Sequence, residues 1–382
     1  MNFIHTLIEF EFMKKLFFVL VISSLLVGCS GQATDSKECI IVGSNTASYD
    51  ANQLSSTLSH FDLIPLETND SCLISDIDVI KKRNNRYYIQ SGRKSLHVFD
   101  ENGKFLRKIG SIGEGPGEYS ILSDFDVDKE CVYLLALHKL YVYDLSGEFQ
   151  KEIRLKDNVR TIKCVDGGFL TFINSAQGED GLGFMDRNGK MVRTALPKNE
   201  ALRVVRMNPW VEWKQDKYFF QMAQSNDLYC FDNQHQEFYK NGYATDYDNA
   251  ISLEELSSIN DMESVKYSGF ILDGFTSSGS QIIFGSIENG KITLYVYDKS
   301  SETSHSIVLQ SIQDDVTFSE CMLLIQNLGK SDSDDENLIT YIETDVLKEA
   351  IEEKDGLDNA VYGKLKNTEE EHNPTIVSYR FK

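Results

Sequence analysis

The sequence lacks the short motifs by which many metal sites and enzymes are recognised. No Cys-x-x-Cys pair occurs, which removes the usual signal for a zinc or thioredoxin-type site. Neither a His-Glu-x-x-His motif nor a Gly-x-Ser-x-Gly elbow is present. We therefore predict no catalytic, cofactor-binding or metal-binding residue. An enzyme is left open, because a triad can assemble in space from scattered residues.

Basic residues are also scarce. The chain of 382 residues has 38 Lys and Arg against 59 Asp and Glu, a formal net charge of −21. Binding to nucleic acid needs clustered Lys and Arg, so we expect no nucleic-acid partner. The excess of acidic residues also argues against electrostatic binding to anionic lipid.

The long apolar run that the chain does have lies at its start. Lys14-Lys15 precede the apolar run Leu16–Val27, and Gly28-Cys29 follow it. Such a run is too short to span a bilayer and is typical of a secretory signal. Glu9 and Glu11 fit the first region of a signal poorly, which favours Met13 as the true start.

The end of this run, Leu26–Cys29, resembles the bacterial lipobox, in which the cysteine becomes the lipidated first residue. The resemblance implies lipidation of Cys29, and two or more acyl chains hold a protein stably on a membrane. We predict a signal peptide over residues 1–28, a lipidated flexible tether over 29–53 and a folded domain over 54–382. The expected location is the bacterial cell envelope at the outer membrane. The periplasmic or the surface side is left open.

Cysteine use after Cys29 permits disulfides without requiring them. An even number of cysteines in an exported chain allows pairing. Several of them lie beside or inside apolar strand patterns, which favours small buried residues over bridges. The pairing is left open among Cys39, Cys72, Cys131, Cys164, Cys230 and Cys321.

A sequence motif that recurs along the chain predicts the architecture. It consists of an apolar strand that ends in an aspartate, a turn and another strand, as in Leu96–Phe105 with its turn at Asn102-Gly103. The first intervals between copies are roughly 40–50 residues, the length of one four-stranded propeller blade, and the last is longer. The aspartates that mark the copies are Asp100, Asp144, Asp186, Asp232 and Asp298.

Both ends of the chain hold further strands. Phe61–Glu67, Leu338–Ile342 and Pro374–Phe381 are apolar and β-prone. Open sheet edges are a liability that ring closure removes. We therefore predict an all-β fold: a six-bladed β-propeller of four-stranded antiparallel blades, closed by N- and C-terminal strands in one blade. Helices are expected at 251–256 and Asp345–Glu353.

One segment carries a family resemblance. Arg107–Tyr119 contains Gly-x-Gly-Pro-Gly-Glu-Tyr, follows Leu96–Phe105 and precedes Phe125–Asp128. Together these segments resemble the NHL-type repeat and the bacterial six-bladed β-propeller lipoproteins. That resemblance covers residues 54–382, where the family has a strand like Phe61–Glu67 before its first blade and one like Asn373–Phe381 at its end. It implies the fold and the location and adds little about mechanism.

Three motifs invite a functional interpretation. Gly113–Gly117 is not a phosphate loop, since no Gly-Lys-Ser/Thr follows, and a tight backbone passage is favoured. Asp124, Asp126 and Asp128 are spaced like part of a calcium loop, but a strand and turn are favoured. Asp332–Glu336 is expected to be a solvated loop, with weak calcium binding as the alternative.

Candidate ligand-binding residues lie in the loops that share one face of a propeller. Basic groups there could form a mouth for an anionic ligand, and ordinary polar loop chemistry is the alternative. The two tryptophans could form a stacking platform or pack inside a blade. The candidates are Arg93, Lys94, His138, Lys139, Trp210, Trp213, Asn226 and Asn289.

The sequence thus favours a lipid-anchored binding or interaction module of the envelope. It would recognise a glycan, a peptide or a partner protein through loops on one propeller face, as a monomer that touches the membrane only through its anchor. The alternative is a propeller enzyme of the lyase or lactone hydrolase type with a metal in its channel. A purely structural role in an outer-membrane complex is a third interpretation.

Overall fold

The computed structural model describes residues 46–173, 181–195, 210–221, 226–244, 270–271, 274–288, 291–319, 324–325, 327–352, 354–368 and 372–382. All of them belong to one compact unit, Lys37–Lys382. In these ranges no helix has the length and apolar character that crossing a membrane requires. The predicted signal peptide, Cys29, Cys39, Cys321 and the helix expected at 251–256 lie outside the described residues.

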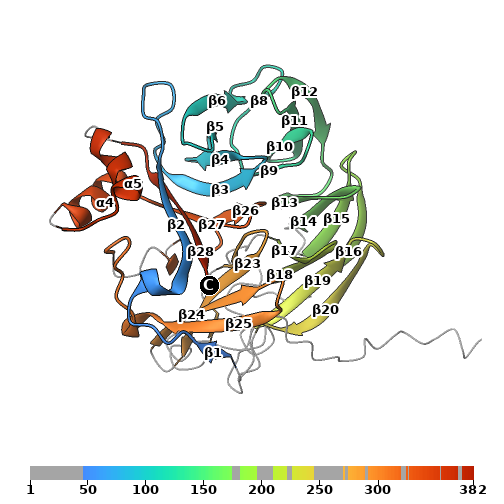
Figure 1. Cartoon of the computed structure of the whole chain (residues 1–382). Coiled ribbons are helices and arrows are strands. Elements are labelled where there is room, and N and C mark those ends of the chain that lie inside the picture. Colours follow the sequence, from blue (N-terminus) through green and yellow to red (C-terminus); the bar gives the residue numbers. More distant parts are fainter. Residues whose placement is uncertain are drawn as a thin grey trace, which may run out of the picture. The chain divides into compact units, whose positions relative to one another are not determined.

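The described chain is mostly β and runs back and forth in successive antiparallel meanders, which Figure 1 shows one after another along the colour scale. Each strand of a meander pairs with its neighbour in the chain. The first four meanders are β3 (Ile77–Arg83), β4 (Arg86–Ser91), β5 (Ser95–Asp100) and β6 (Phe105–Ile109); β9 (Asp124–Val127), β10 (Cys131–Ala136), β11 (Lys139–Asp144) and β12 (Phe149–Arg154); β13 (Val159–Val165), β14 (Gly168–Ile173), β15 (Gly181–Asp186) and β16 (Met191–Ala195); and β17 (Val211–Lys214), β18 (Lys217–Gln221), β19 (Asp227–Asp232) and β20 (Glu237–Tyr243).

A fifth meander joins the first through one short parallel strand. Its strands are β22 (Thr276–Ser277), β23 (Gln281–Glu288), β24 (Lys291–Asp298) and β25 (Thr303–Val308), with β21 (Phe270–Ile271) beside β23. Strand β26 (Ser331–Ser333) pairs in parallel with β22 on one side and with β3 on the other. The two meanders thereby become parts of one 11-stranded sheet.

The two ends of the described chain meet in another sheet. Strand β2 (Leu58–Pro65) pairs antiparallel with β28 (Thr375–Phe381), and β28 pairs with β27 (Leu338–Ile342). Figure 1 shows blue β2 running beside red β28. The predicted pairing of the N-terminal strand with the C-terminal sheet is confirmed. Helix α4 (Thr344–Ile351) follows β27, where the sequence predicts a helix.

The hydrophobic cores lie between successive sheets. Phe172 of the third meander stacks on Phe220 of the fourth, with ring centroids 5.7 Å apart. Clusters of the same kind join the first meander to the second, the second to the third and the fourth to the fifth. Two more join the fifth meander to the β2–β28–β27 sheet and that sheet to the first meander. Every meander therefore buries both faces, which explains why its middle strands, such as β4 and β5, are buried at nearly every position.

The recurring aspartates close the outermost hairpin of their meanders. The carboxylate of Asp100 accepts hydrogen bonds from the backbone N–H groups of Asn102 and Lys104. Asp144 and Asp186 make the same pair of contacts in their own turns. Gly103 takes φ +81°, the left-handed region that glycine enters without strain. The repeat in the sequence is thus the signature of a turn.

The folded part begins before the predicted boundary at residue 54. Strand β1 (Ala47–Ser48) pairs in parallel with β25, and the ring of Tyr49 lies 4.9 Å from that of His305. The last residues of the predicted tether are therefore held by the fifth meander. The remaining elements are β7 (Ser111–Ile112), β8 (Glu118–Tyr119), α5 (Asn359–Tyr362), η1 (Leu54–Thr57), η4 (Leu309–Ser311) and η5 (Gly363–Asn367).

No disulfide joins any two of the four described cysteines, which are Cys72, Cys131, Cys164 and Cys230. The sequence predicts small buried residues at Cys131, Cys164 and Cys230. Cys230 is buried, whereas Cys131 and Cys164 are only partly buried, and Cys72 is buried as well.

Candidate functional site

The first strands of several meanders carry charged side chains at alternate positions, which places them on one face of each strand. Lys81 and Arg83 belong to β3, and Asp124 and Asp126 to β9. These side chains are buried, and so is Asp332 of β26. A buried charge is costly unless it is paired. We call this group, together with Lys163 of β13, the inner-strand network.

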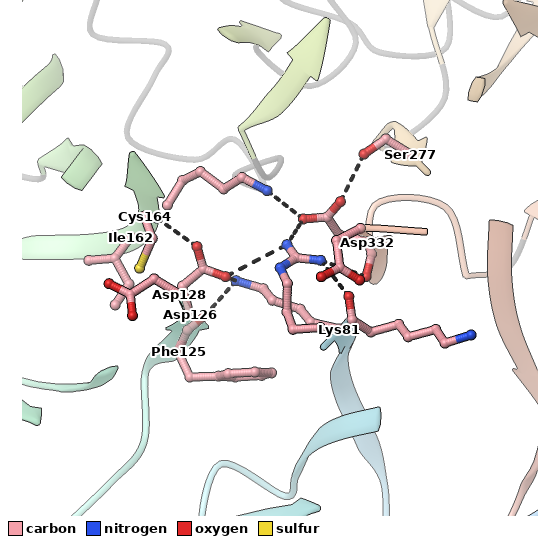
Figure 2. A network of polar contacts seen from close by, with 12 residues as sticks. Lys81, Phe125, Asp126, Asp128, Ile162, Cys164, Ser277 and Asp332 are labelled. Carbon is pink, nitrogen blue, oxygen red and sulfur yellow. Dashed lines mark hydrogen bonds and ion pairs between the residues drawn. The ribbon is translucent and has the colours of Figure 1, made fainter. Parts of the chain in front are cut away.

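Asp332 is the meeting point of this network (Figure 2). Its Oδ2 lies 2.6 Å from Nζ of Lys163 and pairs with the Arg83 guanidinium. The hydroxyl of Ser277 donates to its Oδ1 at 2.9 Å. One carboxylate therefore ties together β3, β13, β22 and β26.

Lys81 forms the second half of the network. Its Nζ lies 3.2 Å from Oδ1 of Asp126 and 3.9 Å from Oδ1 of Asp124. The backbone N–H of Cys164 donates to Asp126 at 2.6 Å, and that of Ile162 donates to Asp124 at 2.8 Å. The two carboxylates of β9 thus hold β13 through backbone hydrogen bonds and also neutralise Lys81.

The pKa values follow from these contacts. Burial opposes the charged form of Asp332, but the charges of Arg83 and Lys163 outweigh it and lower the pKa of Asp332. Burial also raises the pKa of Asp124, and there Lys81 and the Ile162 N–H only partly compensate. Asp332 is therefore firmly ionised, whereas Asp124 is the carboxylate of the network that binds a proton most readily.

The place of Asp332 corrects one prediction. The segment Asp332–Glu336 was expected to be a solvated loop, yet Asp332 is 7% exposed and lies in a strand between β3 and β22. Its cationic partners come from residues far away in the sequence, so local composition does not reveal them. The exposed turn begins only at Asp334, and in it Asp335 pairs with Lys82 and Glu336 with Arg380.

The carboxylates of the network face lysine and arginine rather than one another. Among the described residues no group of three His, Cys, Asp or Glu side chains is arranged to hold a metal ion. Asp124 and Asp126 lie in a strand, as favoured over a calcium loop.

The network separates two cavities. One, of about 470 Å³, lies where β3, β9 and β13 begin and has Arg93 and Trp210 in its wall; we call it the Arg93 cavity. The other, of about 950 Å³, lies where the same three strands end and has Trp213 in its wall; we call it the Trp213 cavity. Lys163 and Asp332 line both.

Three side chains in the wall of the Arg93 cavity hold buried polar atoms that lack a hydrogen-bond partner among the described residues. They are Oε1 of Gln90, Oγ1 of Thr161 and Nε1 of Trp210. Gln90 and Trp210 are only 1% and 2% exposed. An unsatisfied buried polar atom costs roughly 1–3 kcal/mol, so three around one cavity call for an explanation.

Arg93 is held at the rim of this cavity in an unusual conformation. Its φ is +55°, a region that residues other than glycine seldom occupy. The backbone N–H of Arg93 donates to Asp78 at 2.6 Å, and its carbonyl accepts from the N–H of Leu122 at 2.8 Å. Both flanking segments thus fix the loop that presents the guanidinium.

The two tryptophans lie in separate places. Trp210 packs against Phe220, with ring centroids 5.3 Å apart, at the Arg93 cavity. Trp213 is 7% exposed, donates from Nε1 to the Tyr297 hydroxyl at 3.3 Å and lies in the wall of the other cavity. The two rings do not share a platform, and stacking by either one stays a prediction.

The other predicted residues do not join Arg93 and Trp210. His138 and Lys139 line a separate cavity of about 780 Å³ beside Gly113–Pro116, and Lys139 pairs with Glu152 at 2.8 Å. Lys94 is exposed and offers its carbonyl to the Tyr119 hydroxyl. Asn226 is buried, with its carbonyl accepting from the N–H of Ala244. Asn289 lies outside the described residues. The backbone interpretation of the glycine segment agrees with Gly117, whose φ is +78°.

Sequence reasoning missed most of the polar wall, namely Gln90, Arg160, Thr161, Lys81 and Lys163. The signal that could have found part of it is the alternation of charge inside apolar strands, Lys81-x-Arg83 and Asp124-x-Asp126. Charges at alternate strand positions share a face, and two strands of opposite sign suit each other.

Comparison with solved structures shows what the chain is similar to. A candidate exported protein of Bacteroides fragilis NCTC 9343 has a TM-score of 0.71 and 20% identity, over 90% of this chain and 99% of that one. BamB of Moraxella catarrhalis has a TM-score of 0.39 and 11% identity, over 63% and 66%. The Cps50 (Swd1) β-propeller domain of Myceliophteria thermophila has 0.36 and 10%, over 63% and 89%. The first likeness shows a shared fold.

Among curated proteins the comparison found no match. A family model does match, over residues 38–380, which is nearly all of the described chain. Its description is a domain of unknown function, DUF4934, and this chain belongs to that family.

Proposed function

We propose that this protein is a binding module of the bacterial cell envelope that holds a small polar ligand in the Arg93 cavity. One observation carries the proposal: Gln90, Thr161 and Trp210 each hold a buried polar atom that has no partner in the described part of the chain, and all three line this one cavity. A ligand that supplies the missing hydrogen bonds would recover the cost of burying them. Largely formed concave sites with a few polar groups are the usual form of small-molecule sites.

The scaffold of the proposed module is a closed six-bladed propeller. Six hydrophobic clusters link each sheet to the next and the last sheet to the first, which supports this arrangement. The pairing of β2 with β28 supports closure by the two chain ends. In such a ring the inner-strand network fills the central channel, and the Arg93 cavity opens at one end of it.

The proposed location is the outer membrane, with the folded domain tethered through an acylated Cys29. The apolar run before Cys29 supports this, and so does the likeness to a candidate exported protein along almost that protein's full length. In this view the protein is a monomer that touches the membrane through its anchor and meets a glycan, a peptide or an envelope protein with its loops.

The fluorescence of the two tryptophans provides a direct test, because they are the only ones in the chain. In a Trp213→Phe variant, Trp210 is the sole indole and reports on its own cavity. Pools of monosaccharides, short peptides and amino acids are titrated into this variant. We expect one pool to shift the Trp210 emission and to raise the unfolding temperature.

A matched control is His138→Ala, which alters another cavity and should leave the response unchanged. The proposal fails if no pool changes the emission and a crystal structure of the protein with those pools shows only ordered water against Gln90, Thr161 and Trp210.

A further inference from the structure

The proposed function leaves the ligand class open, and the hydrogen-bonding capacity of the cavity wall narrows it. Nε1 of Trp210 can only donate. The Gln90 amide is oriented by its Nε2, which donates to the carbonyl of Leu122 at 3.2 Å, so its Oε1 is left as an acceptor. The Thr161 hydroxyl can do both. The ligand must therefore offer donors and acceptors close together.

Hydroxyl groups on adjacent carbons satisfy this requirement, because every hydroxyl both donates and accepts. A cavity of about 470 Å³ also admits a ligand the size of a sugar ring. Trp210 packs against Phe220 and Phe238, which cover its ring. It is therefore suited to recognise a ligand through its N–H rather than by stacking.

The charges around the cavity decide the sign of the ligand. Of the carboxylates in the wall, Asp124 and Asp332 are paired with cations of the inner-strand network, whereas Asp78, among the residues that the structure describes, accepts only from the backbone N–H of Arg93 and keeps its negative charge. Lys81 and Lys163 are neutralised within that network.

Arg93 and Arg160 differ from these groups. Both are exposed and line the cavity, and within the described residues neither guanidinium has a hydrogen bond or an ion pair. A guanidinium binds carboxylate, sulfate and phosphate groups through two parallel hydrogen bonds. Outside the inner-strand network the wall thus carries two arginines against the single carboxylate of Asp78, in a chain whose net charge is −21.

We propose that the Arg93 cavity binds an acidic sugar, with the ring hydroxyls against Gln90, Thr161 and Trp210 and the anionic group against Arg93 and Arg160. This inference rests on the proposed function and names its ligand class. Because the three inner polar atoms are closed off from solvent, binding requires a local movement of side chains in the wall. A neutral group in place of the anion would lose the contacts with Arg93 and Arg160.

The experiment compares glucuronate and glucose 6-sulfate with glucose, by titration calorimetry on the full-length protein in detergent. An array of oligosaccharides that end in uronic acids covers other stereochemistries. We expect an acidic sugar to bind at least about tenfold more tightly than its neutral counterpart, with an affinity that falls as salt rises. Arg93→Gln and Arg160→Gln should each weaken the acidic sugar about tenfold and leave the neutral one unchanged.

Thr161→Val removes the inner hydroxyl at constant shape and should weaken acidic and neutral sugars alike. Arg154→Gln is the matched control, since this exposed arginine lies outside the cavity and should leave binding intact.

The outcomes separate the two proposals. Equal affinity for acidic and neutral sugars, or an unchanged affinity in the Arg93→Gln Arg160→Gln double variant, overturns the acidic-sugar inference alone. Binding of a peptide that shifts Trp210 emission, with no sugar bound, also overturns it and leaves the proposed function standing. Absence of any ligand, with water alone in the cavity, overturns both.

Discussion

The Nζ of Lys163 lies 2.6 Å from Oδ2 of Asp332, and these two residues stand in the walls of both cavities. One belongs to β13 and the other to β26, strands that are far apart in the sequence. This ion pair therefore connects two sheets that are distant in the sequence, and it separates the Arg93 cavity from the Trp213 cavity. Its strength bears on stability and on the shape of the proposed ligand site.

Replacing Asp332 by Asn keeps the volume and removes the charge. The buried Arg83 and the partly buried Lys163 would then lose their main partner, and breaking a buried pair in this way costs about 3–5 kcal/mol. We expect the free energy of unfolding, measured in urea, to fall by that amount. Asp334→Asn is the control, because Asp334 is exposed in the adjacent turn, and it should change stability by less than about 1 kcal/mol. Equal effects of the two substitutions would show that the network does not hold the sheets.

The turn at Gly103 joins the first meander to the N-terminal strand β2. An added Cβ there would lie 2.4 Å from the carbonyl oxygen of Pro65, and φ is +81°. Gly167 has φ +83° but open space around the same position, so it isolates the conformational cost of about 1–2 kcal/mol. We expect Gly103→Ala to lower the unfolding temperature clearly more than Gly167→Ala. The same loss in both variants would mean that the contact with β2 contributes nothing.

Lys299 gives the protein an alkaline pH dependence. Burial lowers its pKa to about 8, against the opposing pull of Asp332. In the unfolded chain the group keeps its ordinary pKa near 10.5, so between these values the unfolded state binds more protons. The lysine therefore makes folding less favourable below pH 8, and this cost disappears as pH rises toward 10.5.

The measurement is the difference in unfolding free energy between wild type and Lys299→Gln across that range. We expect it to shift in favour of wild type by on the order of 2 kcal/mol with rising pH. If the difference in unfolding free energy does not change with pH, the Lys299 amine is in contact with solvent and its pKa is not lowered. Tyrosine ionisation affects both proteins equally and cancels.

Cys29 provides the test of the anchor. Cys29→Ser in the full-length chain should move the protein from the membrane fraction to the soluble fraction, because the acyl chains supply the attachment. Cys39→Ser, which alters a cysteine that lies after the proposed lipidation site, should stay with the membrane. Membrane retention of the Cys29→Ser protein would contradict lipidation at this residue.

Much of the local structure can be predicted from the residues themselves. The aspartate before Asn102-Gly103 specifies a turn through contacts within a few residues, and the same phrase at Asp144 and Asp186 folds in the same way. The apolar strands and helix α4 follow from periodicity. Among the predicted ligand-binding residues, Arg93 and Trp210 meet in one cavity.

The sequence by itself determined the strands, their turns and the pairing of the two chain ends, because each depends on short-range patterns or on a shared need to cover a sheet edge. Only the tertiary structure decided that Asp332 is buried, that Lys81 and Lys163 come near it, and that Gln90 and Thr161 border the same space as Trp210. These residues are separated by scores of positions, and their contacts depend on the order in which whole sheets pack. A charge or an amide inside a strand has the same local pattern whether it faces water, an ion pair or a ligand.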